Sequence, residues 1–174
     1  LSGFLKFQKY YDEDVFVAAG RRIRNIAREA DTLDPTERVI KIAGLFKYFK
    51  NPDKETVLTP WRVVNMHMSN CLGGWDFYSE SHREEDILDT PRFINRGQVT
   101  KDVFLKQDTR ILEINSKTGL YPLYVTYSVY RAKCMNMEES SLTIEKEREI
   151  WLQTVHDNVF VICKTPMAKA ITKN

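Results

Sequence analysis

Residues 110–121 are the segment of this chain best suited to chemistry. They read Arg-Ile-Leu-Glu-Ile-Asn-Ser-Lys-Thr-Gly-Leu-Tyr, which predicts a strand carrying Glu113, a Thr118-Gly119 turn and a helix that opens at Leu120. Many α/β proteins build a nucleotide-type pocket in this order, at the carboxyl end of a strand. The turn lets backbone N–H groups approach a ligand, and the helix N-terminus favours a carboxylate or phosphate there. Glu113 is suited to bind an ammonium or a hydroxyl group.

The same segment also fits a plain strand-to-helix turn. In that interpretation Gly119 serves only the backbone angles of the turn. Because a single glycine is weak support for a ligand site, the segment alone leaves both interpretations open.

Thr59-Pro60 is a second segment with a possible chemical role. Threonine is a good N-cap residue and proline fits the first turn, so a helix is predicted to begin here. The Thr59 hydroxyl can cap that helix or contact a ligand, and taken in isolation the capping role is favoured.

Residues 160–168 form a third segment, an apolar run followed by Cys163-Lys164-Thr165-Pro166. In a doubly wound sheet the second strand often ends in an acid that holds a ribose. This run has no acid at its end, so a buried strand followed by a helix start is favoured for it.

The elements that would position these segments follow from hydrophobic spacing. Helices are predicted at residues 13–30, from about 34 to 49 and at 60–72, whereas residues 76–100 are predicted to be an irregular connection. Strand signals come at residues 103–104 and again at 111–112. A helix from residue 120, another at 144–156, a strand at 158–163 and a helix at 166–173 follow. This order predicts the first part of a parallel α/β sheet with crossover helices.

Composition limits the possible classes of function. The net charge of +2 does not indicate a strongly basic nucleic-acid-binding protein. We expect no membrane partner, because no apolar run is long enough to span a bilayer. Three widely spaced cysteines indicate reduced thiols in a cytoplasmic setting. No metal site is expected, because the histidines lack close ligand partners.

Taken together, these segments resemble the amino-terminal part of adenine-specific, S-adenosylmethionine-dependent DNA methyltransferases of bacterial restriction–modification systems. The first cofactor motif of that family commonly reads Asp-Pro-Ala-Cys-Gly-Thr-Gly-Gly-Phe. In the same frame Glu113 matches the acid, Thr118-Gly119 matches the Thr-Gly pair and Tyr121 matches the aromatic residue. Thr59-Pro60 resembles the family's Thr-Pro helix start, and the Pro and Ala of residues 163–168 match its Asp-x-Asn-Pro-x-Ala motif in frame.

The resemblance implies a helical N-terminal region at residues 1–56 and a partial, Rossmann-like S-adenosylmethionine-binding domain at 57–174. It implies methyl transfer to the N6 amine of adenine in DNA. The cofactor site would comprise Thr59, Pro60, Glu113, Asn115, Thr118, Gly119 and Leu120. The family's catalytic Asn-Pro-Pro-Tyr-type motif does not occur in the sequence and would lie beyond it. We therefore expect a fragment without activity of its own, with DNA bound through the full-length protein.

Several alternatives remain open at this stage. The chain could be a non-catalytic module that binds another nucleotide or a partner protein of a restriction complex. It could belong to a restriction subunit whose methyltransferase-like fold is structural, and a fused nuclease is possible. An RNA or protein methyltransferase is a further alternative, because a cofactor motif does not select the acceptor.

Overall fold

The computed structural model describes residue 9, residues 12–49 and residues 58–173. The chain divides into two compact units, Leu1–Leu33 and Asp34–Asn174. The domain boundary predicted between residues 56 and 57 lies outside the described residues. No helix in the described part of the chain combines the length and the apolar character needed to cross a membrane.

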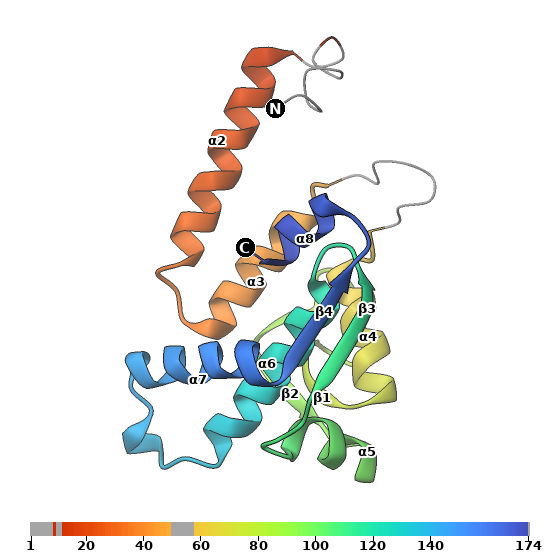
Figure 1. Ribbon diagram of the computed structural model, residues 1–174, viewed down its shortest axis with the longest axis vertical. Coiled ribbons are helices and arrows are strands. Elements are labelled where there is room, and N and C mark those ends of the chain that lie inside the picture. Colours follow the sequence, from red (N-terminus) through yellow and green to blue (C-terminus); the bar gives the residue numbers. More distant parts are fainter. Residues whose placement is uncertain (1–8, 10–11, 50–57, 174) are drawn as a thin grey trace. The chain divides into compact units, whose positions relative to one another are not determined.

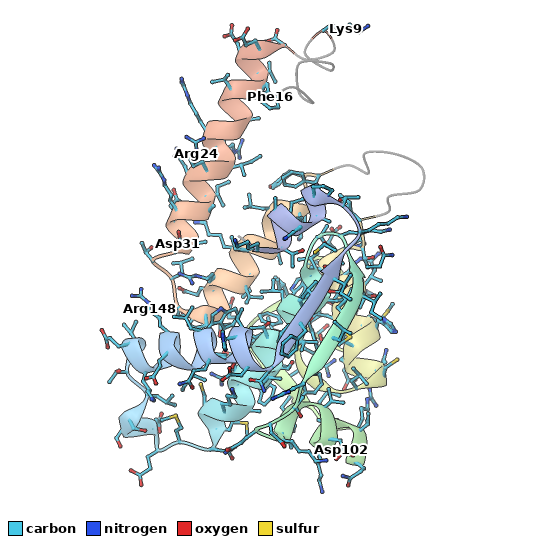
Figure 2. The ribbon with its side chains drawn as sticks, in the orientation of Figure 1. Lys9, Phe16, Arg24, Asp31, Asp102 and Arg148 are labelled. Carbon is cyan, nitrogen blue, oxygen red and sulfur yellow. The ribbon has the colours of Figure 1, made fainter. Side chains whose placement is uncertain are left out.

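The first unit contains helix α2 (Glu13–Ala30), at the position predicted from the sequence. Its N-cap is Asp12, whose carboxylate accepts a hydrogen bond of 3.1 Å from the backbone N–H of Val15. Arg24 lies on this helix and Asp31 follows its last residue (Figure 2).

Helix α3 (Pro35–Phe46) begins the second unit, and its start agrees with the helix predicted from about residue 34. One carboxylate oxygen of Asp34 accepts hydrogen bonds from the backbone N–H groups of Thr36 and Glu37, at 2.7 and 3.0 Å. Helix α4 (Trp61–Cys71) follows the undescribed residues and also lies where the sequence predicted it.

The irregular connection predicted for residues 76–100 is wrong. Strands β1 (Gly74–Tyr78) and β2 (Ile87–Ile94) form an antiparallel pair there. The strand pattern is hidden because every residue of β1 is buried, including Asp76, so the strand shows no polar alternation.

The strand predicted at residues 103–104 is also wrong. Helix α5 (Gln98–Thr100) continues into the π-helical turn η2 (Lys101–Leu105). Phe104 is buried there and packs edge-on against the ring of Tyr124. A short apolar run does not distinguish a buried strand from a buried helical turn.

The carboxyl-terminal half confirms the predicted α/β class. Strands β3 (Ile111–Ser116) and β4 (Val159–Cys163) are parallel and lie side by side in Figure 1, with Glu113 opposite Val161. Between them along the chain come α6 (Leu120–Met135), the short 3₁₀ turn η3 (Glu139–Ser141) and α7 (Ile144–Asp157). Helix α8 (Pro166–Lys173) follows β4.

Helix α6 is the centre of the core, and it contacts both two-stranded sheets. Residues on all its sides are buried, which is typical of a helix enclosed by other elements. Three of its buried tyrosines place their hydroxyl groups on polar partners: Tyr124 donates to the carbonyl of Gly73 at 2.7 Å, Tyr127 bonds Thr36 at 2.7 Å, and Tyr130 donates to Glu147 at 3.0 Å. These bonds tie α6 to neighbouring segments and leave none of the three tyrosine hydroxyls unpaired.

Candidate functional site

Glu113 of β3 is a partly buried acid with unused hydrogen-bonding capacity. Its Oε2 atom is buried, and so is the hydroxyl of Ser116 at the end of the strand. Within the described residues neither atom meets the geometry of a hydrogen bond. Burial raises the pKa of Glu113, and the nearby Ser116 hydroxyl offsets part of that rise. A buried oxygen without a partner is costly, and a ligand that donates a hydrogen bond would relieve that cost.

The turn after β3 has the backbone shape that the sequence predicted. Gly119 has a φ of 77° and is the N-cap of α6, and Asn115 has a φ of 73°. The pairing with β4 also slips between Ile114 and Ser116, which makes a bulge at Asn115. In the part of the chain that the structure describes, no side chain caps α6. Its first N–H groups therefore lack a side-chain acceptor, as an anion site at a helix N-terminus requires.

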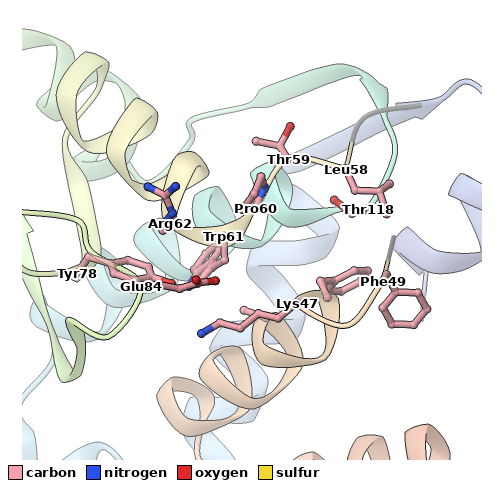
Figure 3. Close-up of a pocket in the computed structure, with 12 residues that line it drawn as sticks. Lys47, Phe49, Leu58, Thr59, Pro60, Trp61, Arg62, Tyr78, Glu84 and Thr118 are labelled. Carbon is pink, nitrogen blue, oxygen red and sulfur yellow. The ribbon is translucent and has the colours of Figure 1, made fainter. Parts of the chain in front are cut away.

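Thr59, Pro60 and Thr118 line one cleft, so the structure brings the two predicted motifs together. The cleft has a volume of about 140 Å³. In Figure 3, Leu58, Thr59 and Thr118 gather at one end, whereas Tyr78 and Glu84 lie at the other. The remaining lining residues are Ala43, Phe46, Lys47, Phe49, Pro60, Trp61 and Arg62.

The capping role favoured for Thr59 is not what the structure shows. The N-cap of α4 is Pro60, and no side-chain cap hydrogen bond is made there among the described residues. Thr59 therefore lines the cleft without fastening the helix start.

The other predicted cofactor residues lie outside the lining of this cleft. Leu120 is in the core and only 2% exposed. A Cβ atom built on Gly119 would lie 3.4 Å from Thr172 of α8, so α8 packs directly over the glycine turn. Glu113 and Asn115 belong to the same strand end but do not line the cleft.

The opposite end of the cleft carries charges that the sequence analysis did not single out. Lys47, Arg62 and Glu84 come from three separate segments. Burial, followed by the negative charge of Glu84, raises the pKa of Tyr78 to about 12. Arg62 lies two residues after Pro60 in the sequence. This closeness to the Thr59-Pro60 segment is the signal that could have marked Arg62 as a lining residue.

A second polar constellation missed by the sequence analysis lies on β1. Asp76 is completely buried, and its Oδ2 atom lies 2.8 Å from His82 Nε2 and 3.2 Å from Arg92 Nη2. Its Oδ1 atom accepts from the backbone N–H of Tyr78 at 3.0 Å. Both carboxylate oxygens are thus engaged within the fold, which assigns this cluster a structural role. Across the described residues, no group of three or more His, Cys, Asp or Glu side chains is placed to hold a metal ion.

Comparisons of the chain with protein-family models, with curated proteins and with solved structures gave no match.

Proposed function

We propose that the chain is part of an S-adenosylmethionine-dependent DNA methyltransferase acting on the N6 amine of adenine. The observation that carries this proposal is the cleft shared by Thr59, Pro60 and Thr118, because the two motifs that resemble the family's cofactor elements meet there. In keeping with a restriction–modification role, we place the protein in the cytoplasm.

The polar groups at the turn suit this cofactor. The ribose hydroxyls and the amines of this cofactor would donate hydrogen bonds to the buried Oε2 of Glu113. Its carboxylate would be favoured near the uncapped first turn of α6. Thr59 and Pro60 would cover the site from the opposite side. The cofactor supplies the methyl group for a direct displacement, so these residues bind and orient it.

The volume of the cleft limits cofactor binding more than its polar groups do. Pockets for small organic ligands usually have volumes of roughly 300–1,000 Å³. The cleft measures about 140 Å³, and Thr172 of α8 lies over Gly119. The whole cofactor is therefore accommodated only if α8 withdraws from the turn. We include this movement in the proposal.

In fold terms, we propose that the order β3, α6, α7, β4, α8 is the opening of a Rossmann-like sheet. The parallel pairing of β3 with β4 supports this, since parallel strands need a crossover connection and here it is helical. The Asn-Pro-Pro-type motif and the target-reading region would be supplied by other parts of the full-length protein.

A calorimetric titration of the chain with S-adenosylmethionine, and separately with ATP, tests this function. We expect S-adenosylmethionine to bind with a stoichiometry of one and ATP to bind at least about tenfold more weakly. Hydrogen exchange run alongside would show faster exchange of α8 amides when the cofactor is bound. Absence of S-adenosylmethionine binding, or tighter binding of ATP, would contradict the proposal.

One observation favours a second candidate, a non-catalytic module that binds a nucleotide or a partner of a restriction complex. Lys47 and Arg62 outnumber the single carboxylate of Glu84 in the cleft, and this net positive charge suits a phosphate better than a sulfonium. Preferential binding of ATP in the titration, lost on Lys47→Ala, would support the module.

A further inference from the structure

The outer face of the β3–β4 pair is apolar and exposed. We define this outer face as Leu112, Ile114, Phe160 and Ile162, which are 54%, 71%, 44% and 53% exposed. Leu112 lies opposite Phe160 and Ile114 lies opposite Ile162, so the four side chains form one continuous patch. Cross-strand neighbours of this kind share a face because side chains alternate along a strand.

The inner face of the same pair is covered. Helices α6 and α7 contact β4, α6 also contacts β3, and the alternate residues of both strands are partly buried. Parallel sheets occur almost only with helices on both faces, because their strands are apolar on both sides. Within residues 34–49 and 58–173, the apolar outer face of this parallel pair therefore lacks the cover that such sheets usually have.

The size of the outer face suits a single helix. Four side chains that are each about half exposed present on the order of 400 Å². A stable dimer of two chains commonly buries about 800 Å² on each partner, roughly twice that area. The outer face is thus too small to hold two copies of the chain together by itself. It matches the apolar stripe of one helix laid across two strands.

Charge at the edges of the outer face narrows the choice of partner. Arg110 precedes the first residue of β3 and Lys164 follows the last residue of β4, and both are exposed. By the alternation of each strand they lie on the same side as the apolar patch, at opposite ends of it. A cation at each end favours carboxylates in the corresponding positions of a partner.

We propose that the outer face binds one amphipathic helix of a partner protein, with an apolar stripe and a carboxylate at each end of that stripe. The proposal does not depend on cofactor binding. The helix covers the outer face as α6 and α7 cover the inner one, and Arg110 and Lys164 fix its direction across the strands.

The test uses fluorescence anisotropy with a labelled amphipathic peptide about 18 residues long, a length at which helices begin to form alone. One peptide carries a leucine stripe with glutamates at both ends, and a second has lysines in place of the glutamates. We expect the glutamate peptide to bind at least about tenfold more tightly. Equal affinity of the two peptides, or no binding, would overturn the proposal.

Matched variants locate the binding surface. Leu112→Lys lies in the outer face, and Leu152→Lys makes the same change at an exposed leucine of α7. We expect the first to abolish peptide binding and the second to leave it unchanged. Lys164→Glu, an exposed substitution that spares the apolar patch, should reduce the preference for the glutamate peptide. Sedimentation that shows self-association lost on Leu112→Lys would overturn the proposal in favour of a second copy.

Discussion

Strands β1 and β3 each carry one acidic residue in the middle of a short strand, but the two acids differ in their burial and in their hydrogen-bond partners. Asp76 of β1 is fully buried and engaged by His82, Arg92 and a backbone N–H. Glu113 of β3 is partly buried, and its Oε2 has no partner in the described chain. A satisfied buried acid holds a fold together, whereas an unsatisfied one is available to a ligand.

The glycines beside the two strands differ in the same way. A Cβ atom on Gly73 would lie 2.3 Å from the carbonyl oxygen of Ile94, whereas one on Gly119 would lie 3.4 Å from Thr172. The first glycine is closed in by the backbone of a neighbouring strand. The atoms nearest to a Cβ on the second glycine are the Cα and side-chain atoms of Thr172 in α8. The turn before β1 is thus fixed by a backbone contact, whereas the turn after β3 meets α8 at an ordinary van der Waals distance.

The largest expected effect contrasts these two glycines. Gly73→Ala forces a backbone clash at a φ of 80° and should lower the free energy of unfolding by about 4 kcal/mol. Gly119→Ala meets only the positive φ and should cost about 1 kcal/mol. Urea unfolding followed by circular dichroism measures both. Similar losses in the two variants would remove the contrast.

The next prediction concerns the acid of β1. Asp76→Asn leaves His82 and Arg92 without their shared carboxylate and should cost about 3 kcal/mol of unfolding free energy. Glu113→Gln, the equivalent change on β3, should not destabilise the chain at neutral pH. The pair is compared by urea unfolding under identical conditions. A destabilisation by Glu113→Gln as large as that of Asp76→Asn would show that Glu113 is structural too.

A smaller difference in stability is expected between two tyrosines of α6, because one hydroxyl is buried and the other is more exposed. The buried hydroxyl of Tyr127 bonds Thr36, and the ring of Tyr127 packs on Phe77 of β1. The more exposed hydroxyl of Tyr121 lies 3.1 Å from His67 Nδ1. Tyr127→Phe should cost about 1 kcal/mol of stability, and Tyr121→Phe less than about 0.5 kcal/mol. We expect a lower urea midpoint for Tyr127→Phe than for Tyr121→Phe. The reverse order of the two midpoints would contradict this prediction.

The smallest effect is the pH dependence that Glu113 contributes. Burial raises its folded-state pKa above the ordinary value of 4.5, so the folded chain holds this proton more tightly than the unfolded chain. Stability from this group is therefore full below pH 4.5 and falls as pH rises through the folded pKa. Glu113→Gln should flatten that slope and stabilise the chain at pH 7 by about 0.5 kcal/mol or less. If the pH dependence of the unfolding free energy did not change in Glu113→Gln, the Glu113 carboxyl would have to be exposed to solvent in the folded chain.

Much of the fold was predictable where local signals agree. Hydrophobic spacing predicted the helix that begins near residue 34, which is α3, and the helix after Gly119, which is α6. The parallel β3–β4 pair followed from strand, helix and strand in order. Each of these helices and strands is specified by residues close to one another in the sequence, and the parallel pairing follows from the order of the elements.

The predictions that were wrong concern segments whose structure depends on contacts with residues distant in the sequence. Strand β1 contains Asp76, which reads as a surface residue until His82 and Arg92 surround it. Phe104 was assigned to a strand because its apolar run gives no period, and only its contact with Tyr124 explains the helical turn. At the candidate site, the family resemblance implied that Thr59 and Thr118 share one site, and both line the cleft. It gave no sign that α8 would cover Gly119, because that contact joins separate elements.

The central claim is that the strand end at Glu113 is a binding site for S-adenosylmethionine. The most direct measurement is the dissociation constant of S-adenosylmethionine for the wild type, Glu113→Gln and the control Glu145→Gln, which makes the same change on the exposed surface of α7. The account predicts at least about tenfold weaker binding for Glu113→Gln, because a charged hydrogen bond is lost, and no change for Glu145→Gln. Equal constants for all three proteins would contradict it.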